Sequence, residues 1–502
     1  MNKSIIIIGA GIAGLSAGCY ARMNGFDVKI FELHHIPGGL CAAWQRKNYL
    51  FDGCIHYLYG SGEGKPFNQI WQELGALRDT GVVNHEELMK VVSPDGQTLN
   101  AYCDPQRLEE EVCRISPADS RLIHGFCQAL RQFQKFDMSI LQHKPRSLWG
   151  AQDWADFGKK MLPYLPAMAR WAGMSAGEFG SRFKSPFLQR AFPLVFGWPE
   201  IPMMAGMSIL AYMSIQNAGF PLGASEAFAR SIENRFLELG GEIYYNAQVE
   251  KILVRDNRAV GVRLYLDDTY EADYVISAAD GRTTLFDMLD GRYLNGELRR
   301  IYDQETGFAV HPMIQVSLGV KRNFSKEPHW VSYLLEEPVL LAGEERNDFG
   351  LKHYCFDPST APAGCSALEV ILRIKYPYWQ HIYGHRLYDS EQEQVADILI
   401  QQIEKVYPGL RSDIELVDVA TPMSYERYTG NWRGSSVGWL LDKRSMFKMI
   451  QGMRKDLPGL GNFFMAGQWV EPGGSVPVVA MSGRNAVQLI CHQEGKPFET
   501  SL

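Results

Sequence analysis

The chain has 502 residues, of which 46% are hydrophobic and 21% are charged, and its formal net charge is −7. This length exceeds a single hydrophobic core, so we expect two or three domains. The acidic balance disfavours nucleic acid as the main partner, because binding phosphates requires a basic surface. The nine cysteines are scattered, without a C-x-x-C pair or a His/Cys cluster at metal spacing. This pattern indicates a reducing cytoplasm and no metal site, rather than a disulfide framework.

The first element is an uncharged stretch, SIIIIGAGIAGLSAGCYA, at residues 4–21. Three alternatives fit such a stretch: a secretory signal, a membrane-spanning helix and the start of a nucleotide site. A spanning helix needs about 20 mostly apolar residues, and a signal needs a basic start and small residues before its cleavage point. Glycines at positions 9, 11, 14 and 18 interrupt the stretch, and their spacing favours the nucleotide site.

A phosphate-binding turn is predicted where the β-branched run at residues 5–8 meets these glycines. The motif Gly9-x-Gly11-x-x-Gly14 follows a buried-strand pattern and opens a helix rich in small residues. In such a motif the first glycine permits the tight turn, the second lets backbone approach a pyrophosphate, and the third permits close helix–strand packing. The N–H groups at the start of the helix, at Ile12 and Ala13, then face the phosphates.

The second strand, at residues 28–31, is followed by an acidic residue. Glu32 lies 18 positions after Gly14, where a carboxylate accepts hydrogen bonds from a ribose hydroxyl and disfavours a 2′-phosphate. The strand, turn, helix and acid together predict a Rossmann-type dinucleotide-binding unit.

Two motifs further along indicate which dinucleotide is bound. They are PGGLC at residues 37–41 and FDGCIHY at residues 51–57. The chain here resembles the flavin amine oxidase and phytoene desaturase superfamily, and FDGCIHYLYG is most similar to its retinol saturase and carotenoid isomerase branch. The resemblance implies FAD as the cofactor, with Gly38, Gly39 and Leu40 lying along it. An ordinary surface turn is the alternative for the glycine pair.

The middle of the chain fits the same superfamily. A helix begins after FPLGA at residues 220–224, and strands are predicted at residues 242–246, 249–255 and 272–279. The resemblance implies backbone contacts from Val249 on the adenine side of the FAD, and it brings Ala278 near the flavin. Ala224 stands where the family often has the second glycine of a pair, so a different turn is expected there.

The C-terminal segment GLGNFFMAGQWVEPGGSVPVVAMSGRN, at residues 459–485, supplies the third block of similarity. Its pattern predicts a strand at residues 462–466, then glycine turns, then a helix that begins near Val476. In the superfamily the N-terminus of this helix points at the flavin pyrimidine ring, which implies FAD contacts for Gly467, Gly474, Ser475 and Val476. Ser475 replaces a glycine that is common in the family, so the approach of the backbone at that point is left open.

These blocks predict an α/β fold in which a discontinuous Rossmann-type FAD-binding domain is interrupted twice. The parts of that domain are residues 1–75, 216–290 and 420–502. Residues 76–215 are predicted to form a mainly helical insertion that covers the substrate. Residues 291–419 are predicted to form a substrate domain of mixed sheet and helix, with strands at residues 312–320 and 367–374.

Three rival motifs carry other chemistry in principle. GMSAG at residues 173–177 matches a serine nucleophile elbow, but a helix pattern precedes it where a strand is required, and Ser175 also fits a capping box. GSGEGK at residues 60–65 lacks the Ser/Thr of a phosphate loop. His381 and His385 have the spacing of metal ligands on a helix but no third ligand, which favours solvated or structural histidines.

The substrate is indicated only indirectly. Residues 201–225 contain no Lys, Arg or Asp, and the predicted helix from Met203 to Ile215 is too short to span a membrane. One interpretation is the packed core of the helical insertion. The other is the lining of a site for a long apolar small molecule, reached from a membrane surface. We therefore expect a cytoplasmic protein that contacts a membrane at most peripherally.

His56 is the titratable imidazole of the FDGCIHY motif, and it could act as an acid or base near the flavin. Orienting its loop is the alternative role. Three functions stay open: an FAD-dependent enzyme that desaturates, saturates or isomerises C–C bonds of an isoprenoid or polyene, an FAD-dependent oxidase of amines, and a lipid-binding escort like the GDP-dissociation inhibitors. The intact glycine motif and Glu32 disfavour the escort. The electron partner and the oligomeric state are left open.

Overall fold

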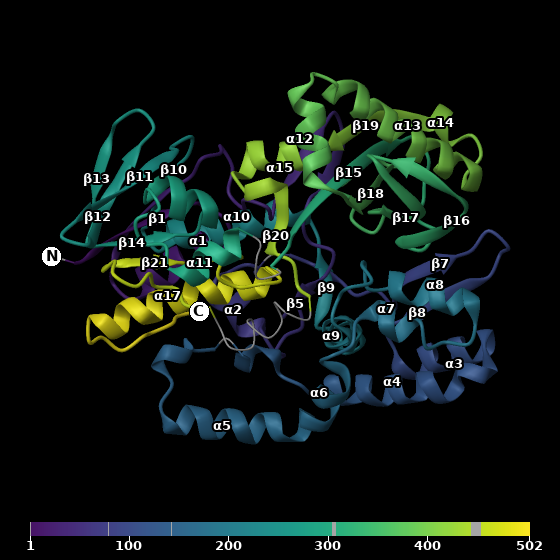
Figure 1. Ribbon diagram of the computed structural model, residues 1–502, viewed down its shortest axis with the longest axis horizontal. Helices are drawn as coiled ribbons and strands as arrows, with labels where there is room; N and C mark the ends of the chain where they lie inside the picture. The colour runs from purple at the N-terminus through teal and green to yellow at the C-terminus, as the bar shows by residue number, and fades with distance from the viewer. Residues whose placement is uncertain (1, 79, 142, 304–307, 443–452) are drawn as a thin grey trace.

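The computed structural model describes residues 2–78, 80–141, 143–303, 308–442 and 453–502. Three regions are visible in Figure 1: a parallel sheet with helices near the N-terminus, a larger sheet covered by helices, and a group of helices along the lower edge. None of the described helices is both long and apolar enough to cross a membrane.

A parallel five-stranded sheet is built from three distant parts of the chain. In spatial order its strands are β10 (Glu242–Tyr244), β2 (Asp27–Phe31), β1 (Ser4–Ile8), β14 (Tyr274–Ser277) and β21 (Phe463–Met465). All four neighbouring pairs are parallel. This sheet confirms the predicted α/β fold, and it joins strands that the sequence analysis assigned to the three FAD-binding parts.

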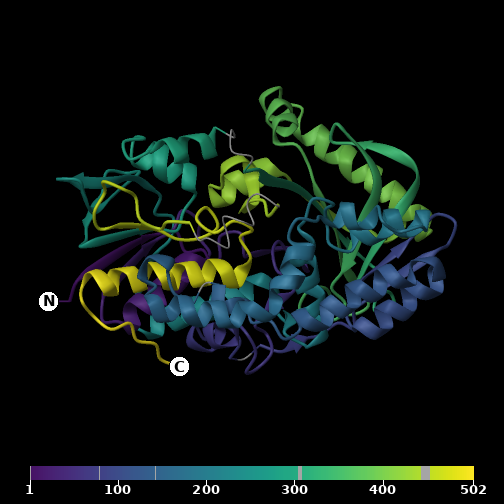
Figure 2. The ribbon, with the colours of Figure 1, turned by 60° about the horizontal axis from the view of Figure 1, so that its bottom comes forward.

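Helix α1 (Ile12–Met23) packs on this sheet and lies against two further helices, α10 (Ala224–Glu238) and α17 (Val476–Gln493). Figure 2 shows the C-terminal helix α17 beside the N-terminal part of the chain. A Cβ atom at Gly483 of α17 would lie 2.2 Å from the carbonyl oxygen of Ala13, and one at Gly18 would lie 2.8 Å from the Phe236 ring. The small residues of both helices are therefore required for their close packing.

The larger sheet lies on the opposite side of the molecule. In spatial order it contains β19 (Ile414–Ala420), β15 (Val310–Val320), β18 (Ser366–Arg373), β17 (Glu344–His353), β16 (Trp330–Leu341), β7 (Glu87–Val92) and β8 (Thr98–Tyr102), and β20 (Ser435–Trp439) pairs with β15. The strands predicted near residues 312–320 and 367–374 are β15 and β18. Helices α12 (Tyr376–Gly384), α13 (Tyr388–Val406) and α14 (Leu410–Asp413) cover one face.

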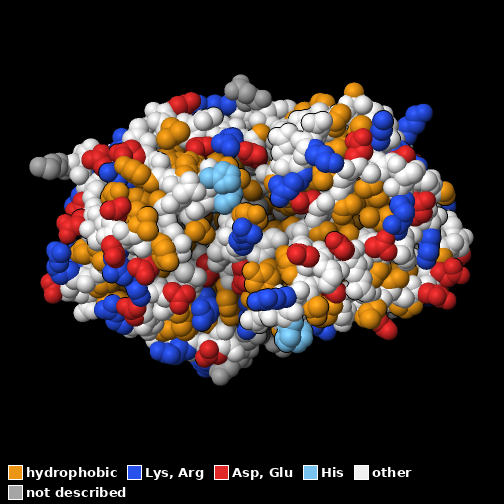
Figure 3. Space-filling model, turned by 90° about the horizontal axis from the view of Figure 1, so that it is seen from above, with side chains coloured by type: hydrophobic (Ala, Val, Ile, Leu, Met, Phe, Trp, Pro, Cys, Tyr) orange, Lys and Arg blue, Asp and Glu red, His pale blue; other side chains and the backbone are white. Residues whose placement is uncertain are grey.

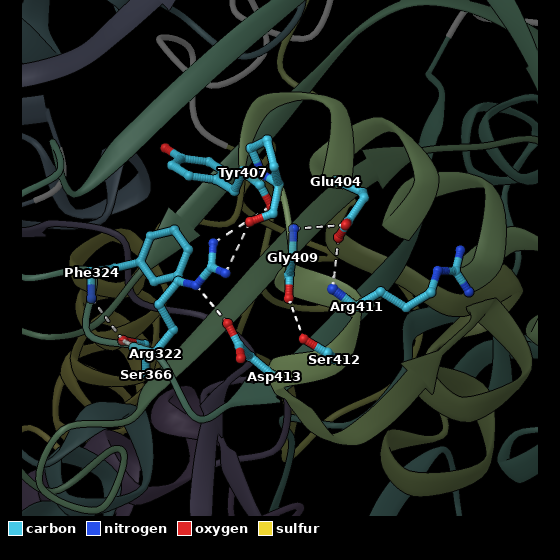
Figure 4. Close-up of polar contacts among 10 residues, drawn as sticks. Arg322, Phe324, Ser366, Glu404, Tyr407, Gly409, Arg411, Ser412 and Asp413 are labelled. Carbon is cyan, nitrogen blue, oxygen red and sulfur yellow. Dashed lines mark hydrogen bonds and ion pairs between the residues drawn. The ribbon is translucent and has the colours of Figure 1, made fainter.

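An arginine fixes the end of β15 to the loop between α13 and α14 (Figure 4). Arg322 donates hydrogen bonds to Asp413 at 2.6 Å and to the carbonyl oxygen of Pro408 at 3.1 Å. The carboxylate of Glu404 accepts the backbone N–H groups of Gly409 and Arg411. Because Gly409 has a φ of +82°, this turn favours glycine. The hydrogen bonds of Arg322 thus connect the end of the sheet to the helices that cover it.

The region at residues 76–215 differs from the prediction at its start. It opens with β6 (Val82–Val83) and the hairpin β7–β8, which joins the larger sheet. The turn signal is Asp95-Gly96, where Gly96 has a φ of +84°. The rest is helical: α3 (Pro105–Ile115), α4 (Ser120–Phe133), α5 (Ala151–Met161), α6 (Leu165–Trp171), α7 (Ala176–Gly180), α8 (Pro186–Leu194) and α9 (Met203–Ser214).

Helix α9 is the apolar segment with two competing interpretations. It packs against α4, α6, α7 and β9 (Ala218–Pro221). Leu210 and Tyr212 are fully buried, and Ser208 and Ile209 are almost so. Residues on every side of the helix are therefore enclosed, as expected for the packed core of the helical region.

The smaller elements complete the described chain. They are β3 (Ala43–Arg46), β4 (Tyr49–Asp52), β5 (Leu58–Tyr59), β11 (Val249–Arg255), β12 (Arg258–Leu264), β13 (Thr269–Glu271), α2 (Asn68–Glu73), α11 (Gly296–Tyr302) and α15 (Pro422–Thr429). Strands β11, β12 and β13 form a separate antiparallel sheet next to the parallel one.

The structure gives two of the rival motifs, those at Ser175 and at His381 and His385, local structural contacts. Ser175 follows helix α6 and caps α7, with its hydroxyl accepting the N–H of Glu178 and its own N–H donated to the Glu178 carboxylate. This confirms the capping box and is incompatible with a nucleophile elbow, which needs a preceding strand. His385 bonds to the carbonyl oxygen of His381. Across the described residues, no group of three or more His, Cys, Asp or Glu side chains is arranged to hold a metal.

Candidate functional site

A long cleft lies at the carboxyl ends of the parallel strands, which is where open α/β sheets bind ligands. Most of the predicted cofactor-binding residues line it. These are Gly9, Gly11, Ile12, Ala13, Glu32, Gly38, Gly39, Leu40, Val249, Ala278, Gly467, Gly474 and Val476. The cleft does not include Gly14, Ser475 or His56 among its lining residues. Residues from both ends and the middle of the chain thus meet in one place.

The turn between β1 and α1 has the geometry that its three glycines predict. Gly9 has a φ of +97°, and Gly11 is the N-cap of α1. A Cβ atom at Gly14 would lie 1.9 Å from the carbonyl oxygen of Gly9. Gly14 therefore acts behind the cleft, by letting the helix approach the turn, and does not contact a ligand itself.

The second glycine turn lies directly against the first. Gly38 and Gly39 both have positive φ angles, and the N–H of Gly38 donates to the carbonyl oxygen of Ala10 at 2.9 Å. A Cβ atom at Gly39 would lie 3.4 Å from the Cα of Gly11. Gly38 and Gly39 therefore form part of the wall of the cleft and are not an ordinary surface turn.

Glu32 is a buried residue in the lining of the cleft. One carboxylate oxygen accepts the N–H of Ala10 at 2.6 Å, and the other accepts the N–H of His34 at 2.8 Å. Burial raises the pKa of this carboxyl, and the backbone donors oppose the shift. Each oxygen keeps a further acceptor position, so the carboxylate is held in place with capacity to accept ribose hydroxyls.

The C-terminal wall combines two glycine turns with the start of α17. Gly467 has a φ of +100°, and its N–H donates to the hydroxyl of Ser482 at 3.0 Å. Gly474 has a φ of +44°. Ser475 is the N-cap of α17 with a φ of −65°, a conformation open to any residue. The replacement of the family glycine by Ser475 therefore causes no backbone strain.

Several lining residues have no counterpart in the sequence analysis. Gln248, Asp280, Asn431 and Gln468 supply polar groups to the cleft. Asp280 accepts the N–H groups of Thr283 at 2.7 Å and Trp432 at 2.9 Å, and burial raises its pKa to about 6. Its position just beyond the carboxyl end of β14 was the available signal, because parallel strands present their binding groups there.

The cleft has to bind phosphates without help from cationic side chains. None of the described residues that line it is a lysine or arginine. The N–H groups in the first turn of α1 lack partners within the helix and lie at the positive end of its dipole. Backbone donors, together with the Gly38–Gly39 turn, are therefore suited to hold a pyrophosphate without a cationic side chain.

His56 is not among the lining residues of this cleft. Its ring is 5.9 Å from that of Trp330, and its Nδ1 atom is buried without a hydrogen-bond partner among the described residues. Burial, followed by the charge of Lys352, lowers its pKa well below the usual value. The imidazole is therefore neutral near pH 7, and it is a weaker base than an exposed histidine. Its catalytic role stays a prediction.

His311 is a second histidine, and its hydroxyl partner lines the cleft. Its Nδ1 atom lies 2.8 Å from the hydroxyl of Ser436, which is a lining residue, and its ring lies 5.3 Å from that of Trp198. Burial, followed by the charge of Arg373, lowers its pKa to about 4. His311 is therefore neutral in the folded protein at pH values where an exposed histidine is protonated.

This shift predicts an acid sensitivity that depends on His311. Between about pH 6.5 and pH 4 the unfolded chain binds a proton at this residue and the folded chain does not, so stability is lost as the pH falls. The substitution His311→Gln should reduce the difference in unfolding free energy between pH 8 and pH 5 by about 2 kcal/mol. Urea unfolding at the two pH values measures it. An unchanged pH dependence in the variant would contradict the assignment.

The chain is similar to known flavin-dependent oxidoreductases along almost its whole length. The family model described as flavin containing amine oxidoreductase matches residues 12–491. A prolycopene isomerase of an Oncidium hybrid cultivar is 25% identical over 511 residues, covering 95% of this chain and 82% of that protein. The lycopene-forming phytoene desaturase of Pseudescherichia vulneris is 25% identical, covering 97% and 99%. A crystal structure of an oxidoreductase from Methanosarcina mazei shares the fold, with a TM-score of 0.60 and 16% identity over 97% of this chain and 100% of that one.

Proposed function

This chain belongs to the family of flavin-containing amine oxidoreductases, and we propose that it acts on C–C bonds of an apolar isoprenoid polyene. It is an FAD-dependent oxidoreductase. The observation that carries the substrate proposal is the match along almost the whole chain to both a prolycopene isomerase and a phytoene desaturase. Such a match includes the regions outside the FAD cleft, where substrate is expected to bind.

The cleft offers suitable residues for each part of FAD: the ribose, the pyrophosphate and the flavin ring. Glu32 would hold the ribose of the adenosine half, the turns at Gly11 and Gly38 the pyrophosphate, and the start of α17 the flavin ring. Bound FAD supplies hydride transfer at its flavin ring. The positive end of the α17 dipole would stabilise negative charge on that ring by about 0.3–1 kcal/mol.

Half-buried aromatic side chains favour an apolar substrate beside the cleft. Trp198 contacts His311, which bonds to the lining residue Ser436, and Trp330 contacts His56. We propose that the polyene lies along these rings, with the neutral imidazole of His56 as the candidate acid or base beside it. Helix α9 is enclosed in the helical core and forms no part of this proposed site.

The test is turnover of defined polyenes by the purified, FAD-loaded protein. Prolycopene and phytoene are supplied in detergent micelles, and products are separated by isomer-resolving chromatography with mass detection. Isomerisation changes retention without changing mass, desaturation removes hydrogen, and saturation adds it. Primary amines are tested in parallel for peroxide release. Amine turnover with unchanged polyenes would replace the proposal with the amine oxidase alternative.

We further propose that helix α5 and its flanking turn form the contact with a membrane surface. Met161 is the only buried residue of α5. Trp154, Leu162 and Leu165 are 54%, 66% and 50% exposed, and Lys159 and Lys160 lie between them. Figure 1 shows α5 at the lower edge of the molecule. Exposed apolar side chains next to lysines favour binding to the interface of an anionic bilayer.

The substitution Trp154→Glu should weaken binding to vesicles of phosphatidylglycerol and phosphatidylcholine by about tenfold, because the exposed indole is lost and a negative charge is added. Vesicle co-sedimentation measures the partition coefficient. Leu266→Glu is the matched control, since Leu266 is 83% exposed in the turn between β12 and β13. Equal binding by both variants and the parent would exclude α5 as the contact. Figure 3 shows the molecule from above, whereas α5 lies at the lower edge in Figure 1. On this upper face, acidic and basic side chains are interspersed.

A further inference from the structure

Two cysteines occupy facing positions at the open end of the β3–β4 hairpin. The strands pair with Ala43 opposite Asp52 and Trp44 opposite Phe51. Beyond the last pair, the N–H of Gly53 donates to the carbonyl oxygen of Ala42 at 3.0 Å. The same register therefore sets Cys41 opposite Cys54. Facing residues in an antiparallel pair have Cα atoms about 4.5–5.5 Å apart, within the range that a disulfide can bridge.

Both cysteines also line the FAD cleft. Cys41 is buried and Cys54 is half-buried, and both are free thiols in this structure. A hydrogen-bonding interaction with the Cys54 side chain, followed by burial, raises the pKa of Cys41 well above its usual value. The two sulfur atoms are therefore close enough to influence each other. Among the described residues, no other cysteine lines the cleft.

A carboxylate lies beside the pair. Asp52 accepts the N–H of Cys54 at 2.9 Å and the hydroxyl of Ser225 at 2.5 Å, and the backbone oxygen of Ser225 lies 3.9 Å from the sulfur of Cys41. Burial raises the pKa of Asp52 to about 6, so it is mostly ionised at neutral pH. Its negative charge is a further cause of the raised pKa of Cys41, so Cys41 stays a protonated thiol, which is the reduced form of the pair.

We propose that Cys41 and Cys54 are a redox-active pair that exchanges two electrons with the bound FAD. In the forward direction two S–H bonds break and one S–S bond forms between the cysteines. The two electrons and two protons released by the thiols pass to FAD, which is thereby reduced. The reverse reaction restores both thiols and oxidised FAD. The pairing and the shared cleft carry this inference, and it does not depend on the polyene substrate.

The direct test is a reductive titration of the FAD-loaded protein after mild oxidation with diamide and removal of the reagent. Because the disulfide and FAD each take up two electrons, the parent protein should consume about twofold more dithionite per flavin than the Cys54→Ser variant. Cys113→Ser is the matched control, since Cys113 is also half-buried but lies on α3. It should behave as the parent does.

Peptide mapping of the parent protein gives a second measurement that needs no variant. Arg46 and Lys47 lie between the two cysteines, so trypsin separates their peptides unless a disulfide joins them. A joined peptide after oxidation, lost after dithionite reduction, is the expected result. The absence of a joined peptide overturns the proposal. So does a disulfide that forms without extra electron uptake, since the pair would then not exchange electrons with FAD.

Discussion

Replacing Gly11 with valine should abolish FAD binding while leaving the protein folded. Gly11 has φ and ψ angles of −66° and 172°, which valine adopts without strain. A Cβ atom there would meet only the carbonyl oxygen of Gly38, at 3.8 Å. The added side chain therefore occupies the cleft at the point where backbone must approach the pyrophosphate. We expect affinity for FAD to fall by at least about 100-fold, which corresponds to about 2.7 kcal/mol.

Flavin absorbance of the purified protein and titration of the apoprotein with FAD measure this loss, and thermal unfolding of the apoproteins measures folding. Gly173→Val is the matched control, because a Cβ atom at Gly173 would meet nothing within 4 Å and the residue lies outside the cleft. The control should bind FAD as the parent does. A folded Gly11→Val protein with normal flavin content would refute the position assigned to the pyrophosphate.

The second large effect is expected at Leu210, in the middle of helix α9. This side chain is completely buried, and the helix is enclosed by α4, α6, α7 and β9. An ionised carboxylate placed there would be unpaired in an apolar core, which costs several kcal/mol. The substitution Leu210→Glu should therefore unfold the helical region or strongly lower its melting temperature, and activity should be lost for that reason.

Differential scanning calorimetry of the Leu210→Glu protein, together with its FAD content, separates the two interpretations of α9. Leu162→Glu is the control for adding a carboxylate in the same region, since Leu162 is 66% exposed. A Leu210→Glu protein that keeps the parent's melting temperature but loses polyene turnover would show that α9 lines a solvated substrate site, contrary to the packing described above.

The phosphate-binding turn was predictable because its requirements are local. Gly9, Gly11 and Gly14 are adjacent in the chain, and each is needed for the conformation or close approach of its own backbone. The motif also predicted the packing role of Gly14. It could not show that Ser475 keeps an ordinary backbone conformation as the cap of α17.

The polar residues of the cleft were missed for a different reason. Asp280, Asn431 and Gln468 come from separate segments, and no fixed spacing in the sequence links them. The hairpin β7–β8 was likewise missed, because its place at the edge of a sheet depends on pairing with β16, more than 200 residues away. Contacts between distant segments leave no periodic pattern in either partner.

By itself the sequence determined the α/β fold, the dinucleotide turn, the acid at Glu32 and the likeness to FAD-dependent oxidoreductases, because these rest on short-range rules of backbone conformation and on motifs with fixed spacing. Only the tertiary structure decided that α9 is core, that His56 is not a lining residue of the cleft while His311 bonds to the lining residue Ser436, and that Cys41 faces Cys54 in the wall of the cleft. These outcomes depend on which buried surfaces meet and in what register, and that choice is made by the packing of the whole chain.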